Sequence, residues 1–494
     1  MKNQLIIAVT TLVFLLIPFA FAQVPDVLWT RTFGGTSNDN CSSAQQTSDG
    51  GFIIFGSTES SGLGGVDAWL IKTDSLGNSL WTKTIGFNEI ERCNDGQETF
   101  NGDLIFTGYT NSIGAGLYDV FLVRTDSFGD TLWTKTFGTS GYESGNAILQ
   151  TPNGGGFVIA GETGATVTGQ HDVYIIKTNS SGNLLWTQSI KGSDEDVAKD
   201  IRQNSNNEYL ITGFTKSFGA GNSDVWLICV NSSGSILWNK TFGGPDEESG
   251  EAIVSTTDGG CAIAGYKYSD ITNDIDVLLI RTNSSGDTLW TKTYGNADTI
   301  EAGYGLAKTD DGGFIITGTV ATLFPLTQNL LVIRTDSLGN VIWTKTIEKD
   351  GYSTGYCIRK SNNNGFIICG EIYPTNRTDS DILAVYLDRE QVTDVFEESA
   401  TPLQGFELMQ NYPNPFNPTT KISWQSPVSS HQSLKVYDVL GNEVATLVDE
   451  FREAGSYEVE FQSAVGNRQL ASGVYFYRLQ AGNYLETKKM ILIK

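Results

Sequence analysis

Short apolar segments alternate with turns rich in Gly, Asp, Asn and Ser along most of this chain. Gly51–Ile54, Asp67–Thr73 and Gly313–Ile316 are typical, since each is rich in large apolar residues and is bounded by turn residues. None follows the 3.6-residue period of an amphipathic helix, whereas β-branched and aromatic residues between tight turns are typical of strands. The pattern therefore predicts an all-β protein.

A tryptophan recurs at spacings of 52 or 53 residues, at Trp29, Trp81, Trp133, Trp186, Trp238, Trp290 and Trp343. After each Trp strand we expect a second strand at about positions +12 to +19, a third that begins with Gly and a fourth that begins with Asp. Self-similarity at a period near 50 residues is typical of propellers and solenoids. Seven such units predict a seven-bladed β-propeller over residues 23–395.

The two ends of the repeat array complement each other. Val27–Phe33 is a Trp strand with no Asp-led strand before it, and Asp381–Leu387 is an Asp-led strand with no Trp strand after it. If the N-terminal strand completes the last blade, the ring closes and both strand edges are covered. An open solenoid would leave both edges bare and would need capping units, which the sequence does not show.

In an up-and-down blade, alternate connections emerge on opposite faces. Asp-Gly-Gly turns such as Asp49–Gly51 share one face with the turns before each Trp, and long connections such as Ser57–Val66 share the other. Acidic stretches, including Glu89–Glu91, Asp194–Asp196 and Asp246–Glu248, also fall on the long-loop face. Two interpretations remain open: a face that binds a cation, a basic partner or a cation-bridged glycan, and a solvated rim that keeps the protein soluble.

The turn before each Trp resembles the repeat of quinoprotein (PQQ-like) and WD40-like propellers. Gly77 lies four residues before Trp81, and Gly129 lies four residues before Trp133, as in the PQQ-like pattern. The step from Asp to Gly is one residue shorter than in that pattern. The resemblance implies a shared blade scaffold and carries no cofactor site with it.

The composition argues against several classes of site. The formal net charge of −24 repels nucleic acid, so no nucleic-acid partner is predicted. The two histidines, His171 and His431, fall in different predicted domains, which makes a Ser-His-Asp or multi-His zinc site hard to build; His171 is expected at the start of a strand. Among 56 acidic residues, no spacing selects a glycosidase-type pair. We assign no catalytic, cofactor-binding or metal-binding residue; the cofactor is unknown, with calcium as a candidate.

The N-terminus has the layout of a secretory signal peptide over residues 1–22. Lys2 supplies the positive charge, Leu5–Phe19 forms the apolar run, and Ala20–Ala22 is an A-x-A cleavage site before Gln23. No later stretch is long and apolar enough for a membrane helix, so no transmembrane helix is expected after cleavage.

Six cysteines in an exported protein raise the question of disulfides. Cys41 and Cys93 lie twelve residues after a Trp and Cys357 lies fourteen after one, so all three are expected on equivalent strands of adjacent blades. A bridge from Cys41 to Cys357 is one candidate. The others, Cys229, Cys261 and Cys369, lie in apolar strands and are expected to be small core residues.

The repeat pattern stops near residue 396, and we expect a linker over residues 396–404 and a separate domain over 405–494. Alternating apolar and polar residues there predict a small Ig-like β-sandwich of about seven strands. The expected strands include Lys421–Trp424, Ser433–Asp438, Tyr457–Phe461, Gly473–Leu479 and Tyr484–Ile493.

This C-terminal segment resembles the sorting domain of type IX (Por) secretion cargo. The residues that carry the resemblance are Asn411, Pro413, Asn414, Pro415, Phe416, Asn417, Pro418, Gly441, Gly473, Tyr475, Lys488, Lys489 and Met490. The resemblance implies that the type IX machinery recognises residues 405–494 as the sorting signal. It further implies passage through the periplasm and across the outer membrane, followed by release or attachment to the cell surface. It says nothing of what the propeller does.

For the propeller we expect a binding or scaffold module with a glycan or protein ligand. The alternative is a secreted polysaccharide hydrolase or lyase with its site on the long-loop face; a quinone-dependent dehydrogenase is third. A catalytic pocket needs unlike residues from several blades, and the repeats stay similar around the ring, which favours binding. The apolar Ala321–Leu326 segment of the sixth blade departs most from its counterparts.

Overall fold

The computed structural model describes residues 21–152, 154–167, 169–269, 274–390, 392–393, 406–452, 455–465, 468–482 and 484–493. The chain divides into one unit over Phe21–Val392 and a second that includes Thr393–Lys494. Most of the predicted export signal and the whole predicted linker, residues 396–404, lie outside the described residues. No helix in the described part of the chain is long and apolar enough to cross a membrane.

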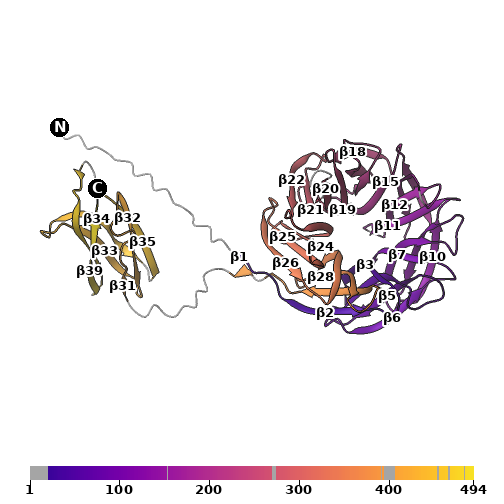
Figure 1. Ribbon diagram of the computed structural model, residues 1–494, viewed down its shortest axis with the longest axis horizontal. Coiled ribbons are helices and arrows are strands. Elements are labelled where there is room, and N and C mark those ends of the chain that lie inside the picture. The colour runs from indigo at the N-terminus through magenta and orange to yellow at the C-terminus, as the bar shows by residue number, and fades with distance from the viewer. Residues whose placement is uncertain are drawn as a thin grey trace. The chain divides into compact units, whose positions relative to one another are not determined.

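Seven four-stranded antiparallel sheets, all within the described residues, form the first unit and lie around a ring (Figure 1). This confirms the predicted all-β class and the propeller. Blade 1 contains β3 (Asp39–Gln46), β4 (Phe52–Thr58), β5 (Asp67–Thr73) and β6 (Ser79–Ile85). Blade 2 contains β7 (Glu91–Glu98), β8 (Leu104–Thr110), β9 (Asp119–Thr125) and β10 (Thr131–Phe137). Blade 3 contains β11 (Tyr142–Gln150), β12 (Phe157–Gly164), β13 (His171–Thr178) and β14 (Leu184–Ile190). Blade 4 contains β15 (Asp196–Gln203), β16 (Tyr209–Thr215), β17 (Asp224–Val230) and β18 (Ile236–Phe242). Blade 5 contains β19 (Glu247–Ser255), β20 (Cys261–Ser269), β21 (Asp274–Thr282) and β22 (Thr288–Tyr294). Blade 6 contains β23 (Ile300–Lys308), β24 (Phe314–Leu323), β25 (Leu326–Thr335) and β26 (Val341–Ile347).

The seventh blade is built from both ends of the propeller sequence. Its strands are β27 (Gly351–Lys360), β28 (Phe366–Pro374), β29 (Asp381–Leu387) and the N-terminal β2 (Val27–Phe33), which pairs with β29. A further short pair joins β1 (Phe21–Ala22) to β30 (Val392–Thr393). Both β27 and β28 contact β3 of the first blade. The predicted closure by the N-terminal strand is confirmed.

Each strand's burial follows its position within the blade. The middle strands, such as β4 and β17, are buried along their whole length because neighbouring blades cover both of their faces. The outermost strands, such as β6, alternate between exposed and half-buried side chains. The large apolar cores therefore lie between blades, and successive blades depend on each other for burial.

The repeated tryptophan connects one blade to the next at six of the seven junctions, whereas Trp343 of blade 6 donates to Glu390 Oε1. Trp29 Nε1 donates to Ser75 O at 3.2 Å, and Trp186 Nε1 donates to Ser232 O at the same distance. In both cases the acceptor lies in the turn of the following blade. The tryptophan ring also packs against the glycine of that turn, whose φ lies between +74° and +85° at Gly77, Gly129, Gly182, Gly234, Gly286 and Gly339. Only glycine fits this position, because the backbone there is left-handed and a β-carbon would collide with the tryptophan ring.

A disulfide joins Cys41 of blade 1 to Cys369 of blade 7. The predicted bridge to Cys357 is wrong, as is the prediction that Cys369 is a free core residue. Cys357 follows an extra residue in its strand whereas Cys41 precedes the equivalent one, so the two cysteines are not at equivalent positions. Cys93, Cys229 and Cys261 are free and buried, as expected for core residues. The bridge covalently links the blades at which the ring closes.

The apolar Ala321–Leu326 segment of blade 6 does not form a long loop. The strands β24 and β25 instead extend to Leu323 and Leu326, which are cross-strand partners. Phe324 at the tip of this hairpin is 96% exposed.

The second unit is a β-sandwich, as predicted. One sheet contains β31 (Glu407–Leu408), β32 (Thr419–Ser426) and β35 (Gly455–Gln462), and the other contains β34 (Glu443–Arg452), β33 (Ser430–Tyr437), β38 (Gly473–Ala481) and β39 (Tyr484–Leu492) in that order. A small ribbon pairs β36 (Ala464–Val465) with β37 (Arg468–Gln469). The core between the two sheets includes Trp424, Tyr477 and Met490.

Substitution of Gly129 by Ala should destabilise the propeller more than the same change at Gly102. Both glycines have positive φ, so each substitution should cost about 1–2 kcal/mol of backbone strain. A β-carbon at Gly129 would also lie 2.9 Å from the Trp81 ring, whereas one at Gly102 would meet nothing within 4 Å. We expect the free energy of unfolding of G129A, measured by chemical denaturation, to lie about 1–3 kcal/mol below that of G102A. Equal losses would contradict the proposed role of the tryptophan contact.

Removal of the disulfide with the double substitution C41S/C369S should lower the free energy of unfolding by about 2–5 kcal/mol, because the bridge closes a loop of 328 residues. Denaturation of the double variant beside the wild type measures this loss. The matched control is C93S, which changes a buried free cysteine and removes no cross-link. A loss no greater than that of C93S would argue against a stabilising bridge.

Candidate functional site

Every innermost strand of the ring contains one extra residue at an equivalent position. In β3 the pairing register with β4 shifts between Cys41 and Ser43, and in β7 the register with β8 shifts between Cys93 and Asp95. The same shift recurs in β11, β15, β19, β23 and β27. The extra residues of these β-bulges, in blade order, are Ser42, Asn94, Asn146, Lys199, Glu251, Tyr304 and Tyr356. We call them the bulge ring.

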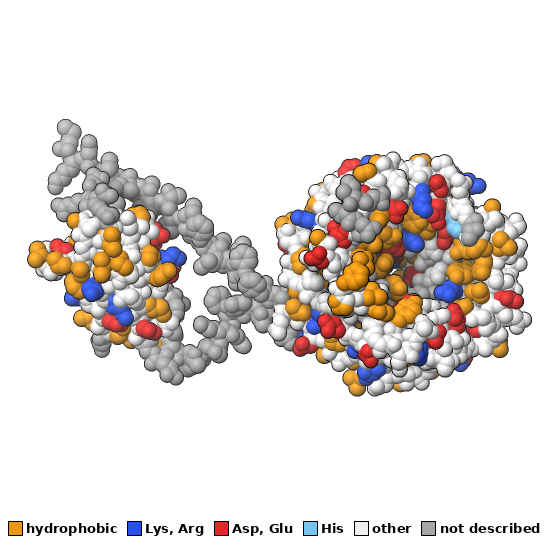
Figure 2. Space-filling model, viewed as in Figure 1, with side chains coloured by type: hydrophobic (Ala, Val, Ile, Leu, Met, Phe, Trp, Pro, Cys, Tyr) orange, Lys and Arg blue, Asp and Glu red, His pale blue; other side chains and the backbone are white. Residues whose placement is uncertain are grey.

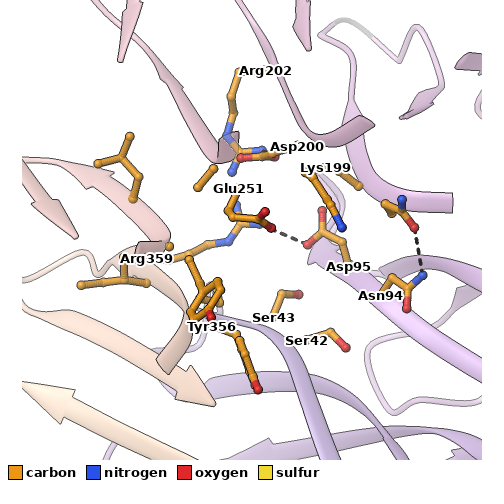
Figure 3. Close-up of a pocket in the computed structure, with 18 residues that line it drawn as sticks. Ser42, Ser43, Asn94, Asp95, Lys199, Asp200, Arg202, Glu251, Tyr356 and Arg359 are labelled. Atoms are coloured by element: carbon orange, nitrogen blue, oxygen red, sulfur yellow. Dashed lines mark hydrogen bonds and ion pairs between the residues drawn. The ribbon is translucent and has the colours of Figure 1, made fainter. Parts of the chain in front are cut away.

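The bulge ring lines a cavity of about 100 Å³ at the centre of the propeller. All seven residues are half-buried, whereas their neighbours on either side along the strand are mostly buried. Figure 2 shows the ring hollowed at its centre, and Figure 3 shows side chains from several blades converging on this space. A β-bulge re-aims a side chain, and here it directs one side chain from each blade into the channel.

The bulge ring is chemically asymmetric. Blades 1 to 3 contribute a hydroxyl and two amides, and Asn94 Nδ2 donates to Asn146 Oδ1 at 3.3 Å. Blades 4 and 5 contribute a positive and a negative charge, Lys199 and Glu251. Blades 6 and 7 contribute two aromatic rings, Tyr304 and Tyr356, whose centroids are 5.5 Å apart. The channel therefore presents a polar, a charged and an aromatic sector.

Burial raises the pKa of both channel tyrosines. The pKa of Tyr304 rises to about 12, mainly through burial and secondarily through the negative charge of Glu251. Burial also raises the pKa of Tyr356, and the carboxylate of Glu371 adds to the effect. Both phenols therefore keep their protons at neutral pH and can donate hydrogen bonds as well as offer an aromatic face.

Fixed ion pairs lie beside the bulge ring, toward the tight-turn face. Arg359 Nη2 lies 3.3 Å from Asp95 Oδ1, and Arg202 Nη1 lies 2.6 Å from Asp200 Oδ1. Asp95 also accepts a bond from Ile148 N, and Asp200 one from Ile253 N. Burial raises the pKa of Asp200, and the charge of Arg202 partly offsets this rise. Burial would lower the pKa of Arg359, but the negative charge around it, chiefly that of Asp95, outweighs burial and raises that pKa.

Toward the long-loop face, Glu371 lies close to the ring. Asn40, two residues before Ser42, donates from Nδ2 to Glu371 Oε1 at 2.6 Å, and Tyr373 OH donates to Glu371 Oε2 at 3.4 Å. Burial raises the pKa of Glu371. Hydrogen bonds thus hold this carboxyl group next to the aromatic sector.

The predicted acidic stretches are only partly on the surface. Glu91, Asp196 and Glu248, the last residue of each stretch, are buried between blades. Some of the other members are paired, as in the 2.7 Å ion pair between Lys216 and the half-buried Glu195. The long-loop face is therefore less acidic than the sequence alone suggests.

Neither histidine belongs to the channel. His171 begins β13, as predicted, and is buried with its Nδ1 2.7 Å from Glu162 Oε2 and its ring stacked on Tyr142. His431 is an exposed residue of the second unit.

The sorting-signal residues fall into two groups in the second unit. Asn411, Phe416, Tyr475 and Met490 are buried, whereas Pro413, Pro415, Asn417, Pro418, Gly441, Gly473 and Lys489 are exposed; Asn414 and Lys488 are half-buried. The structure brings the first segment against the C-terminal strand, since Ile491 N donates to Asn414 Oδ1 at 2.9 Å and Phe416 N to Ile491 O at 2.9 Å. Gly441 lies apart, in the turn between β33 and β34, with φ of +83°.

Residues 410–494 match the family described as secretion system C-terminal sorting domain. This match confirms the predicted sorting tail. It indicates export by type IX secretion, across the outer membrane to the cell surface or the medium.

An alignment of 144 positions shows 23% identity to the regulatory protein FlaEY of Caulobacter vibrioides and covers 24% of this chain and 15% of that protein. A puromycin hydrolase mutant in complex with PGG is similar with a TM-score of 0.45 and 11% identity, over 82% of this chain and 59% of its own. The β-propeller domain of the Trilobed protease from Pyrococcus furiosus is similar with a TM-score of 0.40 and 8% identity, over 74% of this chain and 99% of its own. The number of blades, seven, follows from the strand pairing described above.

The bulge ring was not predicted from the sequence, although its signal is present there. Most of the bulge residues lie thirteen positions after a repeat tryptophan, and Tyr304 lies fourteen after Trp290. At this position the repeats differ in chemistry, from Ser42 to Lys199 to Tyr356. A comparison of the repeats column by column would have found it.

Substitution of Asn411 by Ala should destabilise the sorting domain, whereas the same change at Asn417 should not. Asn411 is 2% exposed, and its Nδ2 donates to Pro413 O at 3.1 Å and to Thr420 Oγ1 at 2.9 Å. N411A removes both bonds from a buried side chain and leaves a cavity beside the remaining bond from Thr420 Oγ1 to Pro413 O, which should cost about 1–3 kcal/mol. Faster amide hydrogen exchange in β32 of N411A, with N417A unchanged, is the expected result; similar exchange in both would contradict it.

Proposed function

We propose that this protein is an exported binding module that holds a saccharide at the centre of its propeller. The observation that carries the proposal is the bulge ring: a repeated scaffold presents five different types of side chain at seven equivalent positions around one cavity. Structural roles would be served by the same residue in every blade, as the repeated tryptophans are. Chemical variation at a single position instead suits the recognition of a ligand that is itself asymmetric.

The chemistry of the three sectors fits a sugar. A pyranose ring has one face of C–H groups that packs on aromatic rings, and Tyr304 and Tyr356 offer such a surface. Its hydroxyl groups need both donors and acceptors. The hydroxyls of Tyr304 and Tyr356 can act as either, and Asn94 Oδ1 can accept, whereas the amide N–H groups of Asn94 and Asn146 bond within the protein. Lys199 and Glu251 extend the same capacity with charged hydrogen bonds, which are stronger.

The channel carboxylates favour binding over hydrolysis. A glycosidase needs two carboxyl groups free to donate a proton and to attack or activate water. Asp95 and Asp200 are instead committed to Arg359 and Arg202 and to backbone N–H groups. Glu251 accepts a bond from Ser249 Oγ at 2.5 Å. The described channel residues thus offer fixed charges in place of a working acid pair.

The export route agrees with this role. A module sent to the cell surface or the medium meets polysaccharides there, and the sorting domain at residues 410–494 supplies the route. The propeller would then act as the recognition part of the cargo.

The test is binding of the full-length protein to a glycan array, followed by titration of the best ligand against the wild type and Y356A. Loss of one aromatic contact should weaken binding about tenfold, since it costs about 1–2 kcal/mol. Y352A is the matched control, because Tyr352 lies on the same strand and is an exposed residue outside the cavity. Equal binding by both variants, or a blank array, would contradict the proposal.

A further inference from the structure

A second ring of residues lies two positions before the bulge ring on the innermost strands. Its members, in blade order, are Asn40, Arg92, Ser144, Val197, Ser249, Ala302 and Thr354. Arg92 is the one charged residue among these seven, so blade 2 differs here from every other blade. Arg92 is half-buried and belongs to β7, the strand that also carries Asn94 of the bulge ring. It therefore lies next to the channel, toward the long-loop face, as Asn40 does.

The guanidinium of Arg92 forms no hydrogen bond or ion pair with any other described residue. Burial raises the pKa of Tyr109 and of Glu371, and the positive charge of Arg92 opposes both rises. The guanidinium thus lies near groups of blade 2 and of blade 7 without being bonded to either. Five N–H donors at the channel mouth are left without a protein acceptor.

Lys199 is in the same situation inside the cavity. It is the one cation of the bulge ring, and Figure 3 shows it among the side chains that line the cavity. Its Nζ lies 5.6 Å from the centroid of the Phe214 ring, and it forms no hydrogen bond or ion pair within the described part of the chain. A half-buried cation loses part of its hydration, so both Lys199 and Arg92 are poised to bond an acceptor from outside the chain.

The carboxylates of the channel, by contrast, already accept hydrogen bonds from the protein. Asp95 and Asp200 accept from arginines and from backbone N–H groups. Glu251 accepts from a serine, and Glu371 accepts from an asparagine and a tyrosine. Among the described residues of the channel, the charged groups that lack a hydrogen-bond partner are therefore both positive.

Beside Arg92, three half-buried tyrosines form an aromatic cluster at the junction of blades 2 and 3. Tyr109 is the cross-strand partner of Arg92, and its ring centroid lies 5.2 Å from that of Tyr118 and 6.2 Å from that of Tyr142. The centroids of Tyr118 and Tyr142 are 5.5 Å apart. The hydroxyls of Tyr109 and Tyr118 form no hydrogen bond with another described residue. Aromatic rings with available hydroxyls suit the apolar face and the hydroxyl groups of a sugar.

We propose that the saccharide is acidic, and that Arg92 binds its carboxylate or sulfate group at the channel mouth while a sugar ring packs on Tyr109 and Tyr118. The planar guanidinium can hold such a group through two parallel hydrogen bonds. Lys199 supplies a second positive charge within the cavity. This inference deepens the proposed function and rests on it, since it names the class of saccharide that the same channel takes.

An acidic sugar satisfies these two cations better than a neutral one. Both kinds displace water from Arg92 and Lys199, but a neutral sugar returns only hydroxyl oxygens, whereas hydrogen bonds with a charged partner are about twice as strong. The net charge of the chain, −24, does not prevent this. Charges on the outer surface are largely screened beyond about 8 Å at physiological ionic strength, so the local cations decide what an oligosaccharide meets in the channel.

The test is calorimetric binding of the full-length protein to matched oligosaccharides. Uronic-acid oligosaccharides are compared with their methyl esters, and sulfated oligosaccharides with their desulfated forms. The wild type should bind at least one acidic form about tenfold or more tightly than its neutral counterpart, because a charged hydrogen bond exceeds a neutral one by enough to change affinity by that factor. The two series distinguish a carboxylate from a sulfate.

R92Q should lose most of this preference and still bind the neutral form as the wild type does. K292Q is the matched control, because it also removes one positive charge at a half-buried position, but on β22, an outermost strand outside both rings. Its preference for the acidic form should equal that of the wild type. Y118A should weaken the acidic and the neutral form alike, since the sugar ring is common to both.

The outcomes separate this inference from the proposed function. Equal affinity of the wild type for acidic and neutral forms would overturn the acidic assignment and leave the saccharide channel standing. So would an unchanged preference in R92Q together with one in K199Q. Failure of the wild type to bind any form, acidic or neutral, would contradict the proposed function itself and this inference with it.

Discussion

The contact between a repeat tryptophan and the glycine turn of the next blade, which recurs at six of the seven junctions, sets the geometry of the ring. The indole of Trp81 can pack there only because Gly129 has no side chain and a positive φ, and Gly129 in turn is shielded from solvent by the ring above it. Each blade therefore fixes the position of the following one by a contact that tolerates neither a larger residue nor a different backbone. The nearly constant repeat length follows from this constraint, because a change in spacing would separate the two partners.

A scaffold held together at its outer rim leaves its innermost strands free to vary. These strands pair with a neighbour on one side only, so an extra residue interrupts few hydrogen bonds. The bulge at Lys199 or Tyr356 therefore costs the blade little and places a side chain in the channel. Binding chemistry can change there from blade to blade without disturbing the contacts between Trp81 and Gly129 or their counterparts.

The sequence was sufficient to predict the strands, the propeller and its closure, because these follow from hydrophobic pattern and from a period that repeats many times. It was insufficient wherever one residue alters local register. The bulge at Tyr356 places Cys357 out of step with Cys41, and the disulfide therefore forms with Cys369 on the adjacent strand. In the same way, Glu91 is part of an acidic stretch in the sequence and a buried group in the fold. Charge composition alone cannot separate these two environments.

Repetition and variation thus have opposite consequences in this ring. Variation at the bulge position creates one asymmetric channel, whereas repetition of the acids near the start of the third strand of one blade and of the first strand of the next creates the same electrostatic problem several times. Lys267 and Arg377 offset the charge at two junctions, and Asn329 and Ser353 replace the acids at the junction of blades 6 and 7. The pairs Asp67 with Glu91 and Asp119 with Glu143 form no ion pair among the described residues. Their carboxylates instead accept hydrogen bonds from loop N–H groups, as Glu91 does from Phe87 N and Glu143 from Thr139 N, so the repeated acids fix the loops at the junctions.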